Sequence, residues 1–172
     1  KEVNGAVERG ISFVLSQQGK DGSCYGSWAV CFTYGTWFAL EALSCVKDNE
    51  QVRDAIKRGC AFLASKQNMD GGWGEHFNSC LTKTYVATEK SQVVNTAWAL
   101  MGLMTAGYAD KTVIEKGVAL LLQRQLPDGD FPQENISGVF NHSCGITYAN
   151  YRNIFPIWAL GKYKHYQTQL LP

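Results

Sequence analysis

The sequence predicts an all-α fold, an αα-barrel in which about three helix pairs form half of a ring. Two observations carry this prediction: one motif recurs three times in 172 residues, and amphipathic helical segments alternate with apolar ones. The apolar content of 45% is ample for the core of one domain. The net charge of +1, with acids and bases interspersed, predicts no nucleic-acid partner.

Each repeat ends a helix-forming run with glutamine and continues through a Gly-containing turn to an aromatic slot. The copies are RGISFVLSQQGKDGSC, RGCAFLASKQNMDGGW and KGVALLLQRQLPDGDF. They place Gln18, Gln67 and Gln125 before the turn, and Cys24, Trp73 and Phe131 in the slot. Asp-Gly is typical of turns, and a glutamine amide can bond the unpaired backbone groups of a helix end. We therefore interpret these motifs, near residues 18–24, 67–73 and 125–131, as structural.

The predicted outer helices precede the motifs, at about residues 3–17, 51–66 and 111–124, and have one charged and one apolar side. The inner segments are nearly uncharged. Residues 28–46 contain one acid, Glu41, residues 93–108 contain none, and a third inner helix is expected near 150–164. Helices that are apolar on all sides are buried, so we expect an inner layer covered by an outer one, with two open apolar edges. Glu41 favours a buried helix over a membrane span.

The six cysteines show no CxxC pairing, and we interpret them as reduced thiols in an intracellular compartment. They are Cys24, Cys31, Cys45, Cys60, Cys80 and Cys144. Two glycosylation sequons, at Asn135 and Asn141, favour the alternative of a secreted protein. The chain begins with lysine and enters a helical pattern at once, as expected of a cut piece or a processed product.

The repeated motif resembles the Gln-Trp signature of the oxidosqualene and squalene-hopene cyclases. Two longer strings are similar to the carboxy-terminal quarter of eukaryotic oxidosqualene cyclases, namely GSWAVCFTYGTWFALEAL and GVFNHSCGITYANYRNIFPIWALGKY. This resemblance, closest to plant-type triterpene synthases, spans essentially the whole chain. It implies that residues 1–172 are the carboxy-terminal part of one αα-barrel domain of the terpenoid cyclase type. The family usually has tryptophan at the position of Cys24, so we expect a looser first turn.

The resemblance implies cyclisation of (S)-2,3-oxidosqualene, a neutral C30 isoprenoid epoxide, through carbocations to a sterol or triterpene alcohol, without a cofactor. An aromatic cavity suits such cations, because water would trap them and each ring face contributes about 2 kcal/mol when desolvated. By their match to the family, Trp37, Phe140 and Tyr148 are implied to line this cavity. Phe140 and Tyr148 lie in the long segment 126–149 between helices. The residues alone leave core packing for Trp37, and loop packing for the other two, as equal alternatives.

The family's initiating acid lies in an Asp-Cys-Thr-Ala-Glu motif, which these 172 residues lack. We therefore expect no catalytic residue in this chain, and expect the remainder of the cyclase chain to supply the acid. A metal site is not expected, because His142 and Cys144 lack the further ligands that zinc needs. The resemblance also implies peripheral attachment to an intracellular membrane, at the endoplasmic reticulum or a lipid droplet.

Two other functional classes are alternatives. A truncated, non-catalytic paralogue would bind an apolar ligand or another subunit through its open edges. An αα-barrel glycosidase would need two carboxylates facing each other across a cleft, and the nearly uncharged inner helices argue against it.

Overall fold

The computed structural model describes residues 2–168, which contain seven helices and one antiparallel two-stranded sheet. The helices are α1 (Glu2–Gln17), α2 (Cys31–Ser44), α3 (Glu50–Ser65), α4 (Asn78–Thr82), α5 (Val93–Ala106), α6 (Lys111–Arg124) and α7 (Ala149–Thr168). The strands are β1 (Gly138–Phe140) and β2 (Cys144–Ile146). The six predicted helices are present, whereas the short α4 and the hairpin of β1 and β2 were not predicted.

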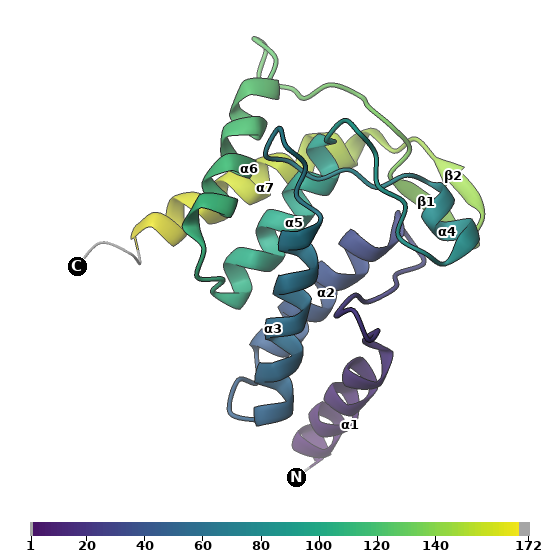
Figure 1. Ribbon diagram of the computed structural model, residues 1–172, viewed down its shortest axis with the longest axis vertical. Helices are drawn as coiled ribbons and strands as arrows, with labels where there is room; N and C mark the ends of the chain where they lie inside the picture. Colours follow the sequence, from purple (N-terminus) through teal and green to yellow (C-terminus); the bar gives the residue numbers. More distant parts are fainter. Residues whose placement is uncertain (1, 169–172) are drawn as a thin grey trace.

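The long helices form three pairs, α1 with α2, α3 with α5, and α6 with α7 (Figure 1). Helix α5 lies between α2 and α7 and packs against both, so these three form the inner row. Every residue of α5 from Val93 to Met104 is buried, as its uncharged sequence predicts. Among residues 2–168, no helix is both long enough and apolar enough to cross a membrane.

Exposed apolar side chains lie on α1, the outer helix of the first pair, and on α7, at one end of the inner row. Helix α1 has no buried residue, and Val3 and Phe13 are mostly exposed. Helix α7 buries only Pro156 and Ala159, while Trp158 is half exposed. The structure therefore has two open apolar edges, as expected for part of a ring.

The three motif corners share one backbone conformation. Gly22, Gly71 and Gly129 have φ between 89° and 91°, a region that side chains disfavour and glycine tolerates. Trp73 is fully buried and its Nε1 donates to the carbonyl oxygen of Leu63 at 2.6 Å, at the end of the preceding helix. The aromatic ring thus closes the corner between α3 and the chain that follows it.

The glutamine of a corner also bonds to the next repeat. Gln67 Nε2 donates to the carbonyl of Gly71 in its own corner at 2.7 Å and to the carbonyl of Val113 in α6 at 2.8 Å. Gln18 Nε2 likewise donates to the carbonyl of Ala55 in α3 at 2.8 Å. Each of these amides therefore holds its corner against the following outer helix.

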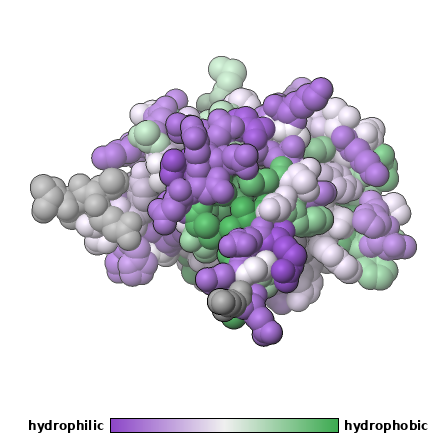
Figure 2. Space-filling view, turned by 90° about the horizontal axis from the view of Figure 1, so that it is seen from below, coloured by the Kyte–Doolittle hydropathy of each residue, from purple (hydrophilic) through white to green (hydrophobic). Residues whose placement is uncertain are grey.

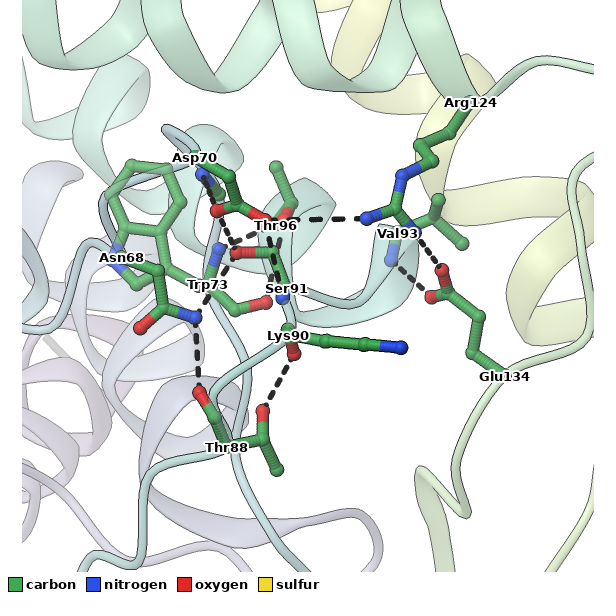
Figure 3. Close-up of polar contacts among 11 residues, drawn as sticks. Asn68, Asp70, Trp73, Thr88, Lys90, Ser91, Val93, Thr96, Arg124 and Glu134 are labelled. Atoms are coloured by element: carbon green, nitrogen blue, oxygen red, sulfur yellow. Dashed lines mark hydrogen bonds and ion pairs between the residues drawn. The ribbon is translucent and has the colours of Figure 1, made fainter.

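Glutamate side chains connect the segment after each of two corners to the inner helix of the preceding pair. Glu75 is fully buried and accepts hydrogen bonds from the backbone N–H groups of Phe32 and Thr33 at the start of α2. Glu134 accepts from the N–H of Val93, the first residue of α5, at 2.6 Å (Figure 3). A negative charge stabilises a helix N-terminus, so each glutamate stabilises the inner helix of the preceding pair.

Cys31 and Cys80 form a disulfide that connects the first residue of α2 to α4. The expectation that all six thiols are reduced is therefore wrong for this pair. The two residues are 49 positions apart, and only the return of the chain through α3 and its corner brings their Cα atoms to 5.9 Å. Cys24, Cys45, Cys60 and Cys144 are free.

Candidate functional site

Five aromatic side chains that are 47 to 61% exposed form what we call the aromatic wall. They are Trp28, Phe38, Phe140, Tyr148 and Trp158. They come from α2 and the segment before it, from β1, and from α7 and the segment before it. Segments far apart in the sequence therefore contribute to one aromatic surface.

The hairpin places Phe140 beside Trp28, with their ring centroids 6.1 Å apart. Strand β1 is held there by backbone hydrogen bonds. The N–H of Val139 donates to the carbonyl of Trp28 at 3.2 Å, and the N–H of Val30 donates to the carbonyl of Ser137 at 2.9 Å. The pairing of these two segments thus fixes the Trp28–Phe140 contact.

Tyr148 belongs to a second set of rings that leads back to α2. Its ring centroid lies 5.3 Å from that of Tyr151, and Tyr151 lies 5.3 Å from Phe155. Phe155 in turn lies 5.5 Å from Trp37. The hydroxyl of Tyr151 donates to the carbonyl of Trp28 at 3.5 Å, which connects the two sets.

Trp37 lies behind the aromatic wall, since its side chain is only 2% exposed. It stacks on Phe38 at 4.5 Å and lies almost parallel to Trp98 at 6.4 Å. Trp158 meets it edge-on at 5.8 Å. The structure thus brings the three residues predicted from the sequence into one aromatic cluster, with Phe140 and Tyr148 on its surface and Trp37 beneath.

Trp28 was not singled out from the sequence, although it is the most exposed ring of the wall. It lies in the predicted inner segment 28–46 but before the observed start of α2, and the match to the family pointed to Trp37 instead. Its sequence signal is a tryptophan three residues before the start of a buried helix. Only the hairpin contact shows which surface it joins.

Glu41, the acid of the inner row that lies nearest to these rings, is paired with a lysine. Glu41 accepts hydrogen bonds from Trp37 Nε1 at 3.1 Å, from the Thr105 hydroxyl at 2.7 Å and from Lys162 Nζ at 2.7 Å. Burial alone would raise the pKa of Glu41, but the hydrogen bonds, first of all from Lys162, outweigh it and lower the pKa. Burial also raises the pKa of Tyr151, with a smaller effect of Tyr148, so this hydroxyl stays protonated.

A cavity of about 340 Å³ borders the aromatic wall between α1 and α2. Trp28, Phe38, Phe13 and Tyr34 contribute rings to its lining, which contains no acidic residue. Within residues 2–168, no group of three or more His, Cys, Asp or Glu side chains is placed to hold a metal ion. The surface is therefore suited to an apolar or cationic group.

Sequence comparison relates the whole chain to one family. The model described as squalene-hopene cyclase C-terminal domain matches residues 1–165. Cycloartenol synthase of Dictyostelium discoideum is 57% identical over 164 residues, which are 95% of this chain and 23% of that protein. Human lanosterol synthase is 51% identical over 176 residues, covering 99% of this chain and 23% of that protein. The chain thus spans less than a quarter of the length of these relatives.

Two solved structures have a similar fold. The type II terpene cyclase MstE from Scytonema, in complex with its product merosterolic acid A, superposes with a TM-score of 0.76 and 15% identity over 93% of this chain and 49% of that one. The ent-copalyl diphosphate synthase from Streptomyces platensis superposes with a TM-score of 0.65 and 20% identity over 88% of this chain and 27% of that one. At such identities the likeness concerns the fold alone.

Proposed function

Because the chain belongs to the squalene-hopene cyclase C-terminal domain family, we propose that it forms one wall of the reaction cavity of an oxidosqualene cyclase. In this reaction (S)-2,3-oxidosqualene is protonated, cyclises through carbocations and loses a proton to give a sterol or triterpene alcohol. The parent protein is then an intramolecular transferase that needs no cofactor. The aromatic wall is the observation that supports this role for the chain.

The wall can stabilise a cation without reacting with it. The faces of Trp28 and Phe140 carry negative electrostatic potential, and each contact with a desolvated cation is worth about 2 kcal/mol. A free carboxylate at this place would remove a proton too early, but Glu41 is engaged by Lys162. The phenol of Tyr148 offers both a ring face and a hydroxyl, which donates or accepts a proton in a hydrogen bond.

Trp37 contributes to this surface through other rings. It supports Phe38 and Trp158 from beneath, at 4.5 and 5.8 Å. Since the chain spans 23% of its relatives, we assign the initiating acid and the other walls to the remainder of the cyclase chain, packed on the open edges at α1 and α7. Residues 1–172 are then the carboxy-terminal part of one αα-barrel domain.

The same proposal includes a peripheral association of the parent protein with an intracellular membrane, at the endoplasmic reticulum or a lipid droplet. Its support is chemical, because a neutral C30 epoxide partitions into lipid and must be taken up from there. The extent of the sequence identity does not favour the alternative of a non-catalytic paralogue.

The test uses the full-length product of the same gene, supplied with oxidosqualene and assayed for cyclised alcohols by gas chromatography and mass spectrometry. We expect Trp28→Ala and Phe140→Ala each to lower turnover roughly tenfold or more, or to change the product, because a contact of about 2 kcal/mol is lost. Leu122→Ala, an exposed apolar residue on α6, is the matched control. Unchanged rate and product in both wall variants would exclude the aromatic wall from the cavity.

A further inference from the structure

A second cavity, of about 510 Å³, lies between α3 and the turn that joins α5 to α6. It is found where α2 and α5 end, whereas the aromatic wall comes from the middle of α2 and α7, from the segments before them and from β1. In Figure 1 the turn between α2 and α3 lies in the lower part of the view, and the turn between α5 and α6 lies above it. Figure 2, seen from below, shows an apolar area bordered by hydrophilic side chains on this face of the molecule. The proposed cyclisation makes no use of this cavity.

The floor of the cavity is apolar. It is formed by Ile56, Cys60, Ala61, Ala106 and Tyr108. Ile56 and Cys60 are 8 and 4% exposed, so this part of the floor is shielded from bulk water, whereas Ala61 is exposed. Burial raises the pKa of the Cys60 thiol to about 11, although Lys47 opposes this, so the thiol is neutral. The volume is in the range of about 300 to 1,000 Å³ that is typical of small-molecule sites.

The mouth of the cavity is positively charged. Lys47, Arg53 and Lys57 line it, and no acidic residue does. Arg53 Nη1 donates to the carbonyl of Lys47 at 3.0 Å, which holds the guanidinium at the turn between α2 and α3. Within the part of the chain that the structure describes, none of these three cations takes part in an ion pair.

Two of the neighbouring acids, Asp54 and Asp110, have hydrogen-bond partners of their own. Asp54 accepts a hydrogen bond from Arg58 at 3.0 Å on the same helix. Asp110 accepts from the backbone N–H of Thr112 at 2.9 Å and begins α6. A cleft with charges of one sign and a low-dielectric floor attracts the opposite charge, here an anion next to an apolar surface.

We propose that this cavity binds an anionic amphiphile, whose acyl chain lies on Ile56, Cys60 and Tyr108 and whose anionic head lies between Lys47, Arg53 and Lys57. A carboxylate or phosphate head suits this mouth, since lysine binds such groups as a point charge and arginine can bind them through two N–H groups. The ligand class follows from the apolar floor and from three cations that form no ion pair within residues 2–168.

The test is calorimetric titration of the chain with dodecanoate below its micelle-forming concentration. We expect saturable binding with about one site, at least tenfold weaker for dodecanol, which lacks the charge, and for butyrate, which lacks the chain. Lys47→Glu/Lys57→Glu should weaken dodecanoate binding about tenfold or more. Lys20→Glu/Lys164→Glu, which changes the net charge equally at exposed positions outside the cavity, should leave it unchanged.

Ala61→Trp provides a second test that leaves the charges in place. Ala61 is exposed on α3, so a larger side chain can fill the cavity without entering the core, and we expect dodecanoate binding to be lost. Vesicles of phosphatidylcholine with phosphatidylglycerol distinguish the source of the ligand. Co-sedimentation that depends on Lys47 and Lys57 assigns the anionic head to a membrane lipid, and dodecanoate binding without co-sedimentation assigns it to a free amphiphile.

The proposal is overturned if dodecanoate does not bind saturably, or if dodecanol binds as tightly. Binding that neither the charge reversal nor Ala61→Trp reduces would equally exclude this cavity. None of these measurements depends on cyclase activity, so a negative result here would leave the proposed function unaffected.

Discussion

The carboxylate of Glu75 accepts hydrogen bonds from both the backbone N–H and the hydroxyl of Thr33, each at 2.9 Å, although the two residues are 42 positions apart. Glu75 has no exposed surface, and its other oxygen accepts from the N–H of Phe32 at 3.0 Å. These N–H groups belong to the first turn of α2, whose own N-cap residue, Val30, has no side chain that could bond them. The start of one inner helix thus depends on a carboxylate from the next repeat.

Glu75→Ala should lower the free energy of unfolding by about 3 kcal/mol. Hydrogen bonds to charged groups contribute roughly 1.5–3 kcal/mol, and the substitution leaves buried N–H groups without acceptors. Urea denaturation followed by circular dichroism measures the change. Glu89→Ala, at an exposed glutamate, is the control and should change stability by less than about 0.5 kcal/mol. Equal effects of the two substitutions would contradict the role of Glu75.

The glutamines of the second and third corners should differ in their effect on stability. Gln67 bonds both its own corner and Val113, whereas within residues 2–168 the amide nitrogen of Gln125 donates only to the carbonyl of Gly129. Gln67→Ala should therefore destabilise the chain by about 1 kcal/mol more than Gln125→Ala, the value of one additional hydrogen bond. Thermal unfolding of both variants gives the comparison, and a larger effect of Gln125→Ala would refute it.

The Glu41–Lys162 ion pair, which joins α2 to α7, predicts a pH dependence of stability. The pKa of Glu41 is lowered in the folded state, so its contribution is complete above its unfolded pKa, about 4.3, and is lost as the pH falls through the folded value. Glu41→Gln should therefore destabilise the chain at about pH 6 and much less at about pH 3. Urea denaturation at both pH values measures the difference. Glu8→Gln, at an exposed glutamate, is the control, and its effect on stability should not depend on pH in this way.

The first motif corner should be less rigid than the second. Trp73 donates to the carbonyl of Leu63 at 2.6 Å, and Cys24, in the same slot, has no indole to make this bond. Hydrogen exchange should therefore be faster for amides near Gln18 than for those near Gln67. Trp73→Cys should raise exchange near Gln67 toward the level of the first corner. Faster exchange near Gln67 in the unsubstituted chain would refute this expectation.

Periodicity and turn residues were sufficient to predict the six long helices. The segment 111–124 is found with the predicted limits, because Asp110 begins it with a side-chain hydrogen bond and the motif ends it. The segment 28–46 is helical only from Cys31 to Ser44. Its true start depends on Glu75, and a contact across 42 positions leaves no local signal in the sequence.

The other features that the sequence did not predict also depend on contacts between distant residues. The turn of the β1–β2 hairpin places Asn141 and His142 at positive φ, without a glycine that would have marked it. The contact of Trp28 with Phe140 and the disulfide of Cys31 with Cys80 depend on this hairpin and on α4. The family resemblance implied an aromatic surface, but only the tertiary contacts decide which rings are exposed and which, like Trp37, support them.

The two kinds of connection between repeats run in opposite directions along the chain. Gln67 reaches forward to α6, and Glu134 reaches back to α5. In repeat proteins, stability is approximately the sum of the intrinsic stability of each repeat and the interaction energy between neighbouring repeats. These hydrogen bonds contribute to the interaction energy between repeats. The pair of α3 and α5 is coupled on both sides, and a chain cut after α5 would lose a carbonyl acceptor and a helix cap together. Unfolding of this molecule should therefore spread from its edges toward one central, last-melting pair.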